Sequence, residues 1–250
     1  MNMKVENEMA LPITKSVTVM LLEPYAGKLA RTVLRGESSR KGADLLDLAS
    51  CPAPDAPGSK QVAALMTITG LIDAPKADKE FLSINGAQGF STFYGYYMLE
   101  AMATAGNYQG ALDVIREYWG AMIDLGATSF WEDFDINWIP NAAPIDELVP
   151  EGKKDIHGDC GAYCYVGFRH SLCHGWASGP TSWLSRHILG VEVIEPGCRQ
   201  VRITPHLGDL QWVKGTFPTP YGEIQIYHEK QANGNVISEV KAPKGVSVIK

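Results

Sequence analysis

Apolar residues recur at helical spacing over the middle of the chain, from about Lys60 to Leu189. The stretch SKQVAALMTITGLI predicts the first helix, because Ser59 suits an N-cap and Gly70 suits a helix end. Its expected apolar face consists of Val62, Leu65, Met66 and Ile68 or Thr69. The pattern indicates an amphipathic helix that packs through these side chains.

Two more helices are predicted directly after one another. STFYGYYMLEAMATAGN has Ser91 as its candidate cap and ends at Gly106 and Asn107, whereas YQGALDVIREYWGAMIDLG ends at Gly126. The expected apolar faces are Phe93, Tyr96, Tyr97, Leu99 and Met102 or Ala103 in the first, and Leu112, Ile115, Tyr118, Trp119 and Met122 in the second. Because the link between them is so short, we expect an antiparallel helical hairpin.

A fourth helix is predicted in GPTSWLSRHILG, where Pro180 suits the first turn and Gly190 suits the end. A long loop, from about Asp133 to His170, separates it from the third helix and contains several prolines. Long loops without regular structure are uncommon unless they serve a site. We therefore expect this loop to border a functional site.

After Gly190 the pattern changes to short alternating runs with Gly and Pro between them. Alternation in EIQIY and the sequence NGN at residues 233–235 predict antiparallel strands joined by a hairpin turn. The chain is thus predicted to be mainly α with a C-terminal all-β domain. The expected units are a poorly assigned segment at 1–55, which reads as loop or weak helix, a helical part at 56–190 and a β domain at 191–250.

Composition supports a globular chain and excludes several classes of partner. Of the 250 residues 45% are hydrophobic, enough for one large domain or two smaller ones. The net charge of -6, without a long basic run, argues against nucleic-acid binding and against a polybasic membrane face. No apolar run approaches a membrane span, and the first residues make a poor signal peptide. We expect a neutral or polar substrate, and localisation and oligomeric state stay open.

Cysteine chemistry and nucleotide binding are not favoured. The five cysteines are odd in number and contain no CxxC pair, so we expect mostly buried, inert thiols. Cys160 and Cys164 lie near His157 in the sequence, but no glycine motif for an oxyanion hole accompanies them. The phosphate-binding glycine motifs of nucleotide enzymes are also absent from the sequence. No cofactor is predicted.

Three stretches carry a resemblance to a known family. GATSFWEDF, RHSLCHGWASGPTSWLSRHILGV and ITPHLGDLQWVKGTFPTPYGEIQI, with STFYGYYMLEAM upstream, resemble in order and spacing the C-terminal part of bacterial α-L-rhamnosidases of glycoside hydrolase family 78. The resemblance runs from roughly Lys60 to the C-terminus and does not include residues 1 to about 55. It implies part of an (α/α)6 toroid, the six-hairpin glycosidase fold, followed by a C-terminal antiparallel β-sandwich.

The resemblance also implies a mechanism that needs two carboxyl groups. Family members invert the anomeric centre, so one carboxylic acid protonates the leaving oxygen while a carboxylate takes a proton from water. Glu132 occupies the position of the family's general base, although a solvated carboxylate at a helix-to-loop junction is the structural alternative. The family's general acid has no counterpart in this sequence. We therefore expect a portion of a rhamnosidase that is incomplete and inactive by itself.

The neighbours of Glu132 are candidates for sugar binding. His174 matches the family histidine that hydrogen-bonds the innermost sugar, and His170 and His174 lack a further ligand that would favour a metal site. Trp131 is interpreted either as an apolar wall for the sugar or as a core residue, and Trp176 as part pocket wall and part packing. Asp133 and Asp135 either bind sugar hydroxyls or hold the neighbourhood of Glu132, with solvated loop acids as the structural alternative. For His157 and Asp159 the loop interpretation is preferred.

Three functions are therefore compared. The leading hypothesis is a glycoside hydrolase, or part of one, that removes terminal α-L-rhamnose from glycans or glycosides. The second is a six-hairpin glycosidase for another sugar, because the toroid is shared between specificities. The third is an inactive relative that binds carbohydrate. In all three the expected partner is a carbohydrate.

Overall fold

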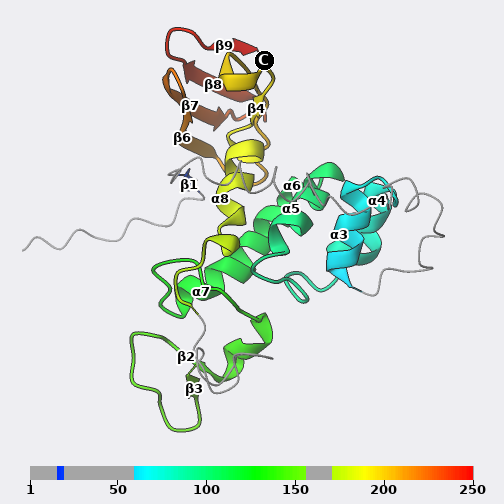
Figure 1. Cartoon of the computed structure of the whole chain (residues 1–250), viewed down its shortest axis with the longest axis vertical. Helices are drawn as coiled ribbons and strands as arrows, with labels where there is room; N and C mark the ends of the chain where they lie inside the picture. The colour runs from blue at the N-terminus through cyan, green and yellow to red at the C-terminus, as the bar shows by residue number, and fades with distance from the viewer. Residues whose placement is uncertain (1–15, 20–58, 156–170, 250) are drawn as a thin grey trace, which may run out of the picture.

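The computed structural model describes residues 16–19, 59–155 and 171–249. Small β sheets lie at one end of the long axis, helices fill the middle, and the loop that carries β2 and β3 lies at the opposite end (Figure 1). A helical region followed by small, largely antiparallel sheets is the order that the sequence predicts. The closed toroid and the sandwich stay predictions.

The first described helix, α3 (Lys60–Ile68), confirms its predicted ends but not its predicted face. The Ser59 side chain accepts a hydrogen bond from the Val62 amide, and Gly70 adopts a φ of 75° after the helix. The buried residues are Ala63, Ala64, Met66 and Thr67, whereas Val62, Leu65 and Ile68 are 39 to 43% exposed. Met66 is buried as predicted, but the rest of the predicted face was wrong because α3 packs on α5 through small side chains, which let the two backbones approach closely.

Helices α4 (Ala74–Ala77) and η1 (Asp78–Leu82) lead to α5 (Gly95–Thr104). The side chain of Ser91 does not cap α5, contrary to the prediction, because the helix begins four residues later and Ser91 contributes only its carbonyl to the Gly95 amide. Leu99 and Met102 are buried as expected, but Phe93 lies before the helix and is exposed. Phe93 is thus displaced toward the surface, whereas Tyr96 and Tyr97 are partly buried.

The third predicted helix is continuous and made of α6 (Tyr108–Val114), η2 (Ile115–Trp119) and α7 (Gly120–Asp124). Its buried side chains confirm the predicted face at four of five positions, and Ile115 is partly buried. Asn107 caps α6 by accepting a hydrogen bond from the Gly110 amide at 2.9 Å. Helices α5 and α6 pack on each other and form the predicted hairpin.

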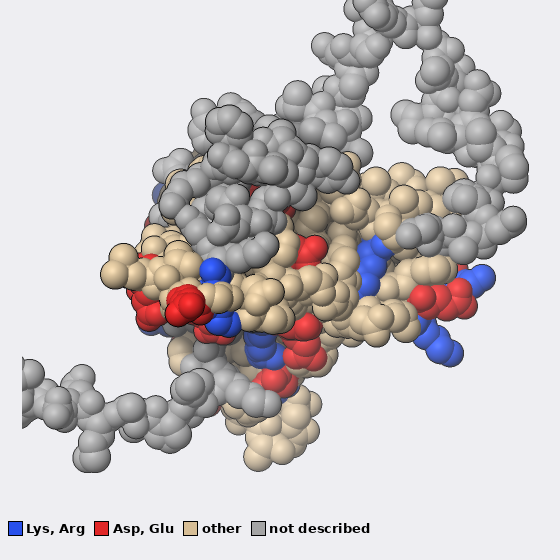
Figure 2. Space-filling model, turned by 90° about the horizontal axis from the view of Figure 1, so that it is seen from below, with Lys and Arg blue, Asp and Glu red and all other residues tan. Residues whose placement is uncertain are grey.

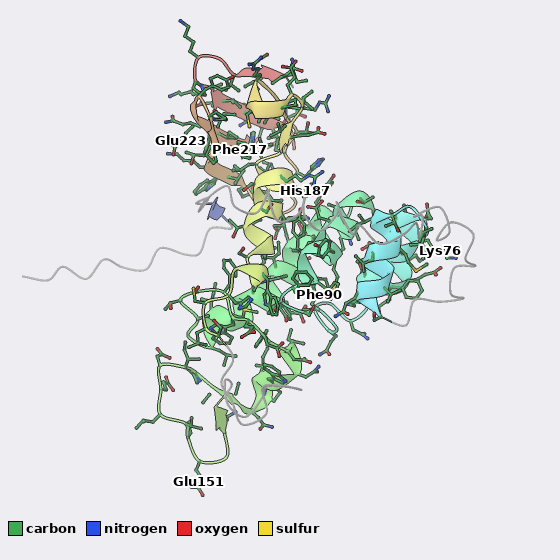
Figure 3. The ribbon with its side chains drawn as sticks, in the orientation of Figure 1. Lys76, Phe90, Glu151, His187, Phe217 and Glu223 are labelled. Atoms are coloured by element: carbon green, nitrogen blue, oxygen red, sulfur yellow. The ribbon has the colours of Figure 1, made fainter. Side chains whose placement is uncertain are left out.

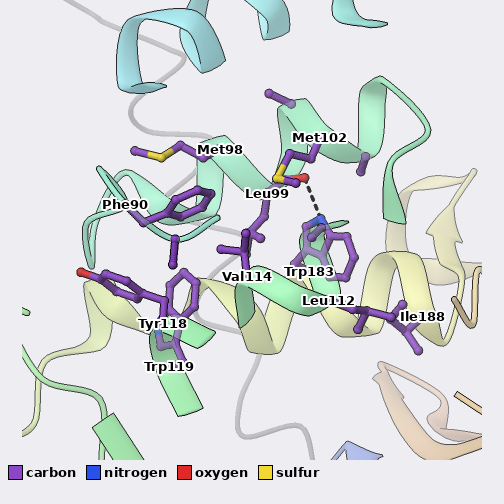
Figure 4. Close-up of a cluster of buried hydrophobic side chains, with 14 of the residues drawn as sticks. Phe90, Met98, Leu99, Met102, Leu112, Val114, Tyr118, Trp119, Trp183 and Ile188 are labelled. Carbon is purple, nitrogen blue, oxygen red and sulfur yellow. Dashed lines mark hydrogen bonds between the residues drawn. The ribbon is translucent and has the colours of Figure 1, made fainter. Parts of the chain in front are cut away.

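The fourth helix consists of α8 (Gly179–Trp183) and η6 (Leu184–Ile188), with Pro180 in its first turn as predicted. The buried indole of Trp183 donates a hydrogen bond of 3.0 Å to the carbonyl of Leu99 in α5. Figure 4 shows this bond within the hydrophobic cluster between the helices. One side chain therefore fixes α8 against α5.

The β region contains two sheets. Strands β1 (Ser16–Val19), β6 (Trp212–Thr219), β7 (Gly222–Lys230) and β8 (Val236–Lys241) form one, and β4 (Val191–Val193), β5 (Gln200–Ile203) and β9 (Ser247–Ile249) form the other. The predicted NGN turn joins β7 to β8, with Gly234 at a φ of 85°. Neighbours pair antiparallel as expected except β1 with β6 and β5 with β9, which pair in parallel.

The loop after α7 contains η3 (Ile136–Asn141), β2 (Ala142–Ala143) and β3 (Lys154–Asp155). Glu151 lies at its tip, far from the two sheets of the β region (Figure 3). In the described part of the chain, no helix is both long and apolar enough to cross a membrane. Lys and Arg side chains are interspersed with Asp and Glu on the face shown in Figure 2, so no sign of charge dominates this view.

The structure describes two of the five cysteines, and Cys173 does not fit the prediction of mostly buried thiols. Cys173 is exposed and Cys198 is partly buried, and both are free thiols. Cys173 lies in the loop before η5 (Gly175–Ala177), where short turns replace a packed helix and leave the thiol at the surface. Cys51, Cys160 and Cys164 lie outside the described residues.

Candidate functional site

The segment that contains Glu132 begins where the third helix ends. Gly126 adopts a φ of 89°, and a Cβ at this position would lie 2.9 Å from the Asp146 carboxylate. Glycine is therefore favoured by the backbone conformation, whereas the Asp146 side chain could move aside for a Cβ. The chain turns there and continues in an irregular segment toward Glu132.

Two backbone hydrogen bonds join this segment to the one that carries His174. The amide of Glu132 donates to the carbonyl of Ser171 at 2.9 Å, and the amide of His174 donates to the carbonyl of Phe130 at 2.8 Å. The two motifs that the sequence singles out are separated by the long loop. The structure brings their backbones side by side.

Four hydrogen bonds fix Glu132, which is partly buried. Besides its amide bond to Ser171, its Oε2 accepts a bond of 2.8 Å from the Ser171 amide. Its carbonyl accepts two more, at 2.6 Å from the Thr92 hydroxyl and at 2.7 Å from the Trp176 indole. Backbone and carboxylate are thus both anchored, as a group that must hold one orientation requires.

Three rings lie beside Glu132 and form what we call the aromatic ledge: Phe93, His174 and Trp176. The ring centroid of Trp176 lies 4.1 Å from that of His174 and 5.8 Å from that of Phe93. Trp176 is 42% exposed and Phe93 is 36% exposed. Exposed rings with a polar neighbour offer the apolar surface on which the C–H face of a sugar packs.

Trp131, in contrast, has no exposed surface. Its ring meets that of Phe134 edge-on, with the centroids 6.0 Å apart, in the main hydrophobic core. A ligand at the surface does not reach such a side chain in this arrangement. Of the two interpretations of Trp131, the structure favours packing over sugar contact.

Asp133 and Asp135 organise the loop. Oδ1 of Asp133 accepts a bond of 2.9 Å from the Phe134 amide, and Oδ1 of Asp135 caps η3 by accepting from the amide and the side chain of Asn137. Their charges and burial together raise the pKa of Tyr118, burial being the larger cause. The Tyr118 hydroxyl donates to the Phe134 carbonyl. These contacts favour a structural interpretation of both aspartates.

Sequence reasoning missed Thr92, Phe93 and Ser171 as members of this site. Phe93 was expected on a buried helix face, and Thr92 and Ser171 lie within the motif stretches but were assigned no role. The one sequence signal for Thr92 was the polar pair Ser91 and Thr92 before the aromatic residues that follow. The same pattern is typical of an ordinary helix start. His157, Asp159 and His170 lie outside the described residues. Among the described residues, no group of three or more His, Cys, Asp or Glu side chains could hold a metal ion.

Comparison with known proteins supports the resemblance in two ways. Residues 190–249 match the family model described as the bacterial alpha-L-rhamnosidase C-terminal domain. The sequence matches no curated protein significantly. The match to the family model is therefore confined to the β region. The similarity to solved structures also includes the helices.

Three solved structures share the fold over 76% of this chain. They are a family 78 rhamnosidase of Bacillus sp. GL1 (26% identity, TM-score 0.58, 18% of that chain), the α-L-rhamnosidase of Aspergillus terreus (20%, 0.59, 21%) and that of Streptomyces avermitilis in complex with L-rhamnose (17%, 0.58, 17%). This chain thus spans about a fifth of the length of these enzymes.

Fold and motifs together define a helical region with a following β region of the glycoside hydrolase family 78 type. The chain is a relative of the α-L-rhamnosidases of that family.

Proposed function

We propose that this chain contributes the general-base side of an inverting α-L-rhamnosidase site, with Glu132 as the base. The observation that carries the proposal is the convergence of Ser171, Thr92 and Trp176 on Glu132 beside the aromatic ledge. A carboxylate held in one direction beside exposed rings suits a catalytic base. The helical part, 56–190, is proposed to belong to an (α/α)6 toroid and residues 191–250 to a β-sandwich, after a segment at 1–55 whose strand β1 pairs with β6.

The proposed chemistry assigns one proton transfer to this chain. Glu132 takes a proton from a water whose oxygen bonds to the anomeric carbon, while the bond to the leaving oxygen breaks on the opposite face. A carboxylic acid about 6.5–9.5 Å away protonates that oxygen in enzymes of this type. His174 and the ring of Trp176 are proposed to hold the sugar, His174 by a hydrogen bond and Trp176 by apolar contact.

The test uses α-L-rhamnosyl fluoride, because fluoride departs without a proton and the reaction then depends on the base alone. The chain should hydrolyse this compound above the spontaneous rate and release the inverted anomer first, observed by NMR. Glu132→Gln should lower the rate about 10²- to 10⁴-fold. Glu147→Gln, which removes an exposed acid of the same loop, is the matched control and should keep the rate.

Equal rates for wild type and Glu132→Gln would contradict the assignment of the base. The exposed rings of the aromatic ledge also support a second candidate, carbohydrate binding without hydrolysis. That function would give L-rhamnose binding by calorimetry together with hydrolysis no faster than the spontaneous reaction. A Trp176→Ala variant should lose such binding.

A further inference from the structure

We propose that Thr92 and Trp176 are positioning residues that set the direction of the Glu132 side chain. The inference rests on the proposed function of Glu132 and concerns residues that do not take part in bond breaking. Both residues donate a hydrogen bond to the same carbonyl oxygen, at 2.6 Å from Thr92 Oγ1 and at 2.7 Å from Trp176 Nε1. A carbonyl has two lone pairs, so these two donors complete its hydrogen bonding.

The effect of the two donors follows from backbone geometry. The peptide before Glu132 is fixed by the bond from its amide to the Ser171 carbonyl. The peptide after Glu132 is fixed by Thr92 and Trp176. Because only φ and ψ separate two planar peptides, fixing both planes fixes both angles and therefore the direction of the Cα–Cβ bond. The Ser171 amide then holds the far end of the side chain at Oε2.

The donors come from two separate parts of the fold. Thr92 is only 4% exposed and precedes α5, so the hydrogen bond of its hydroxyl lies in a poorly solvated environment and its loss is not readily replaced by water. Trp176 belongs to η5, near the start of α8. These two hydrogen bonds connect Glu132 to the segments that precede α5 and α8. The bond from Trp183 to Leu99 already joins these two helices.

Trp176 also links the base to the ledge. The same side chain donates to the Glu132 carbonyl through its indole N–H and packs its ring against His174 and Phe93. A sugar that rests on this ring therefore contacts the group that orients the base. Trp176→Phe separates the two roles, because phenylalanine keeps an aromatic face and removes the donor.

The experiment reads the orientation of Glu132 without depending on activity. The Ser171 amide donates to Glu132 Oε2, so its proton and nitrogen NMR shifts should follow the protonation of that carboxylate as pH changes. Glu132→Gln identifies this titration by removing it. In Thr92→Val the amplitude of the titration should fall to less than half, and Trp176→Phe should act in the same direction. Thr92→Ser keeps the hydroxyl and should restore the wild-type curve.

The matching kinetic result is a fall in kcat for α-L-rhamnosyl fluoride of about 5- to 10-fold in Thr92→Val, with KM unchanged, as loss of one hydrogen bond predicts. A wild-type Ser171 titration in both Thr92→Val and Trp176→Phe would overturn the positioning role. If the Ser171 titration changes in Thr92→Val and Trp176→Phe but Glu132→Gln hydrolyses the fluoride at the wild-type rate, the proposed function is contradicted. The positioning role of Thr92 and Trp176 is then retained. If Thr92→Val does not fold, Trp176→Phe and Thr92→Ser decide the question.

Discussion

At the scale of single residues, Lys60 shows how burial alters chemistry in this chain. Its Nζ lies 5.2 Å from the centroid of the Phe90 ring and donates to the Gly86 carbonyl. Burial lowers the pKa of Lys60 to about 8, and the charge of Glu117 opposes part of this shift. Between that value and the ordinary 10.5, the unfolded chain binds more protons than the folded chain, so stability increases as pH rises.

We predict that the free energy of unfolding of the wild type rises relative to that of Lys60→Met between pH 7 and pH 9.5. The variant lacks the group whose proton is lost on folding, so its curve should be flatter. Urea unfolding at several pH values measures both curves. Lys76→Met, at an exposed site, is the control and should keep the wild-type slope. Parallel curves for wild type and Lys60→Met would refute the argument.

At the scale of elements, Gly190 determines how the last helix passes into the β region. It adopts a φ of 72° between η6 and β4, and a Cβ there would lie 2.3 Å from the backbone of Thr204. Its carbonyl also accepts a bond of 2.9 Å from the Thr204 amide. The turn therefore demands a residue without a side chain for two independent reasons, conformation and space.

Gly190→Ala should destabilise the protein by about 2 kcal/mol or more, because the strained conformation adds to a clash with backbone that cannot move aside. Gly120→Ala is the matched control, since this helical glycine has open space around its Cβ position and alanine is the better helix former by about 1 kcal/mol. Thermal unfolding compares the two. An unchanged melting temperature in Gly190→Ala would show that the turn tolerates a side chain.

At the scale of the whole molecule, aromatic and charged residues join the helices to the β region. His206, between β5 and β6, stacks on Tyr108 of α6 with the ring centroids 3.7 Å apart. Its amide donates to the carbonyl of His187, whose ring contacts Glu100 of α5 at 3.0 Å. Both histidines line an open pocket of about 260 Å³. Figure 3 places His187 where the helix after α8 meets the β sheets.

This junction predicts a loss of stability in acid. Burial, and secondarily the charge of His187, lower the pKa of His206 below its ordinary 6.5. As pH falls through 6.5 the unfolded chain gains a proton that the folded chain resists, so stability falls. His206→Phe keeps the stacking and should show a weaker fall in melting temperature from pH 7.5 to pH 5. Tyr108→Phe, which retains the imidazole, should behave like the wild type, and equal acid sensitivity in His206→Phe would contradict the assignment.

Much of the fold was predictable because its signals are local. The cap at Ser59, the helix ends at Gly70, Gly126 and Gly190 and the NGN turn depend on neighbours a few residues away. Contacts of this kind can be predicted from the local sequence alone. The sequence by itself also determined that a helical region precedes small β sheets and, through three motifs, the family to which the chain is related.

Only the tertiary structure decided which surfaces are buried and which groups meet. Helix α3 buries alanines rather than its larger apolar residues, since close approach to α5 selects small side chains. Thr92, Ser171 and Trp176 converge on Glu132 from positions up to 44 residues away, and Trp131 turns inward to the core. These outcomes depend on packing between distant segments, which periodicity and caps do not encode.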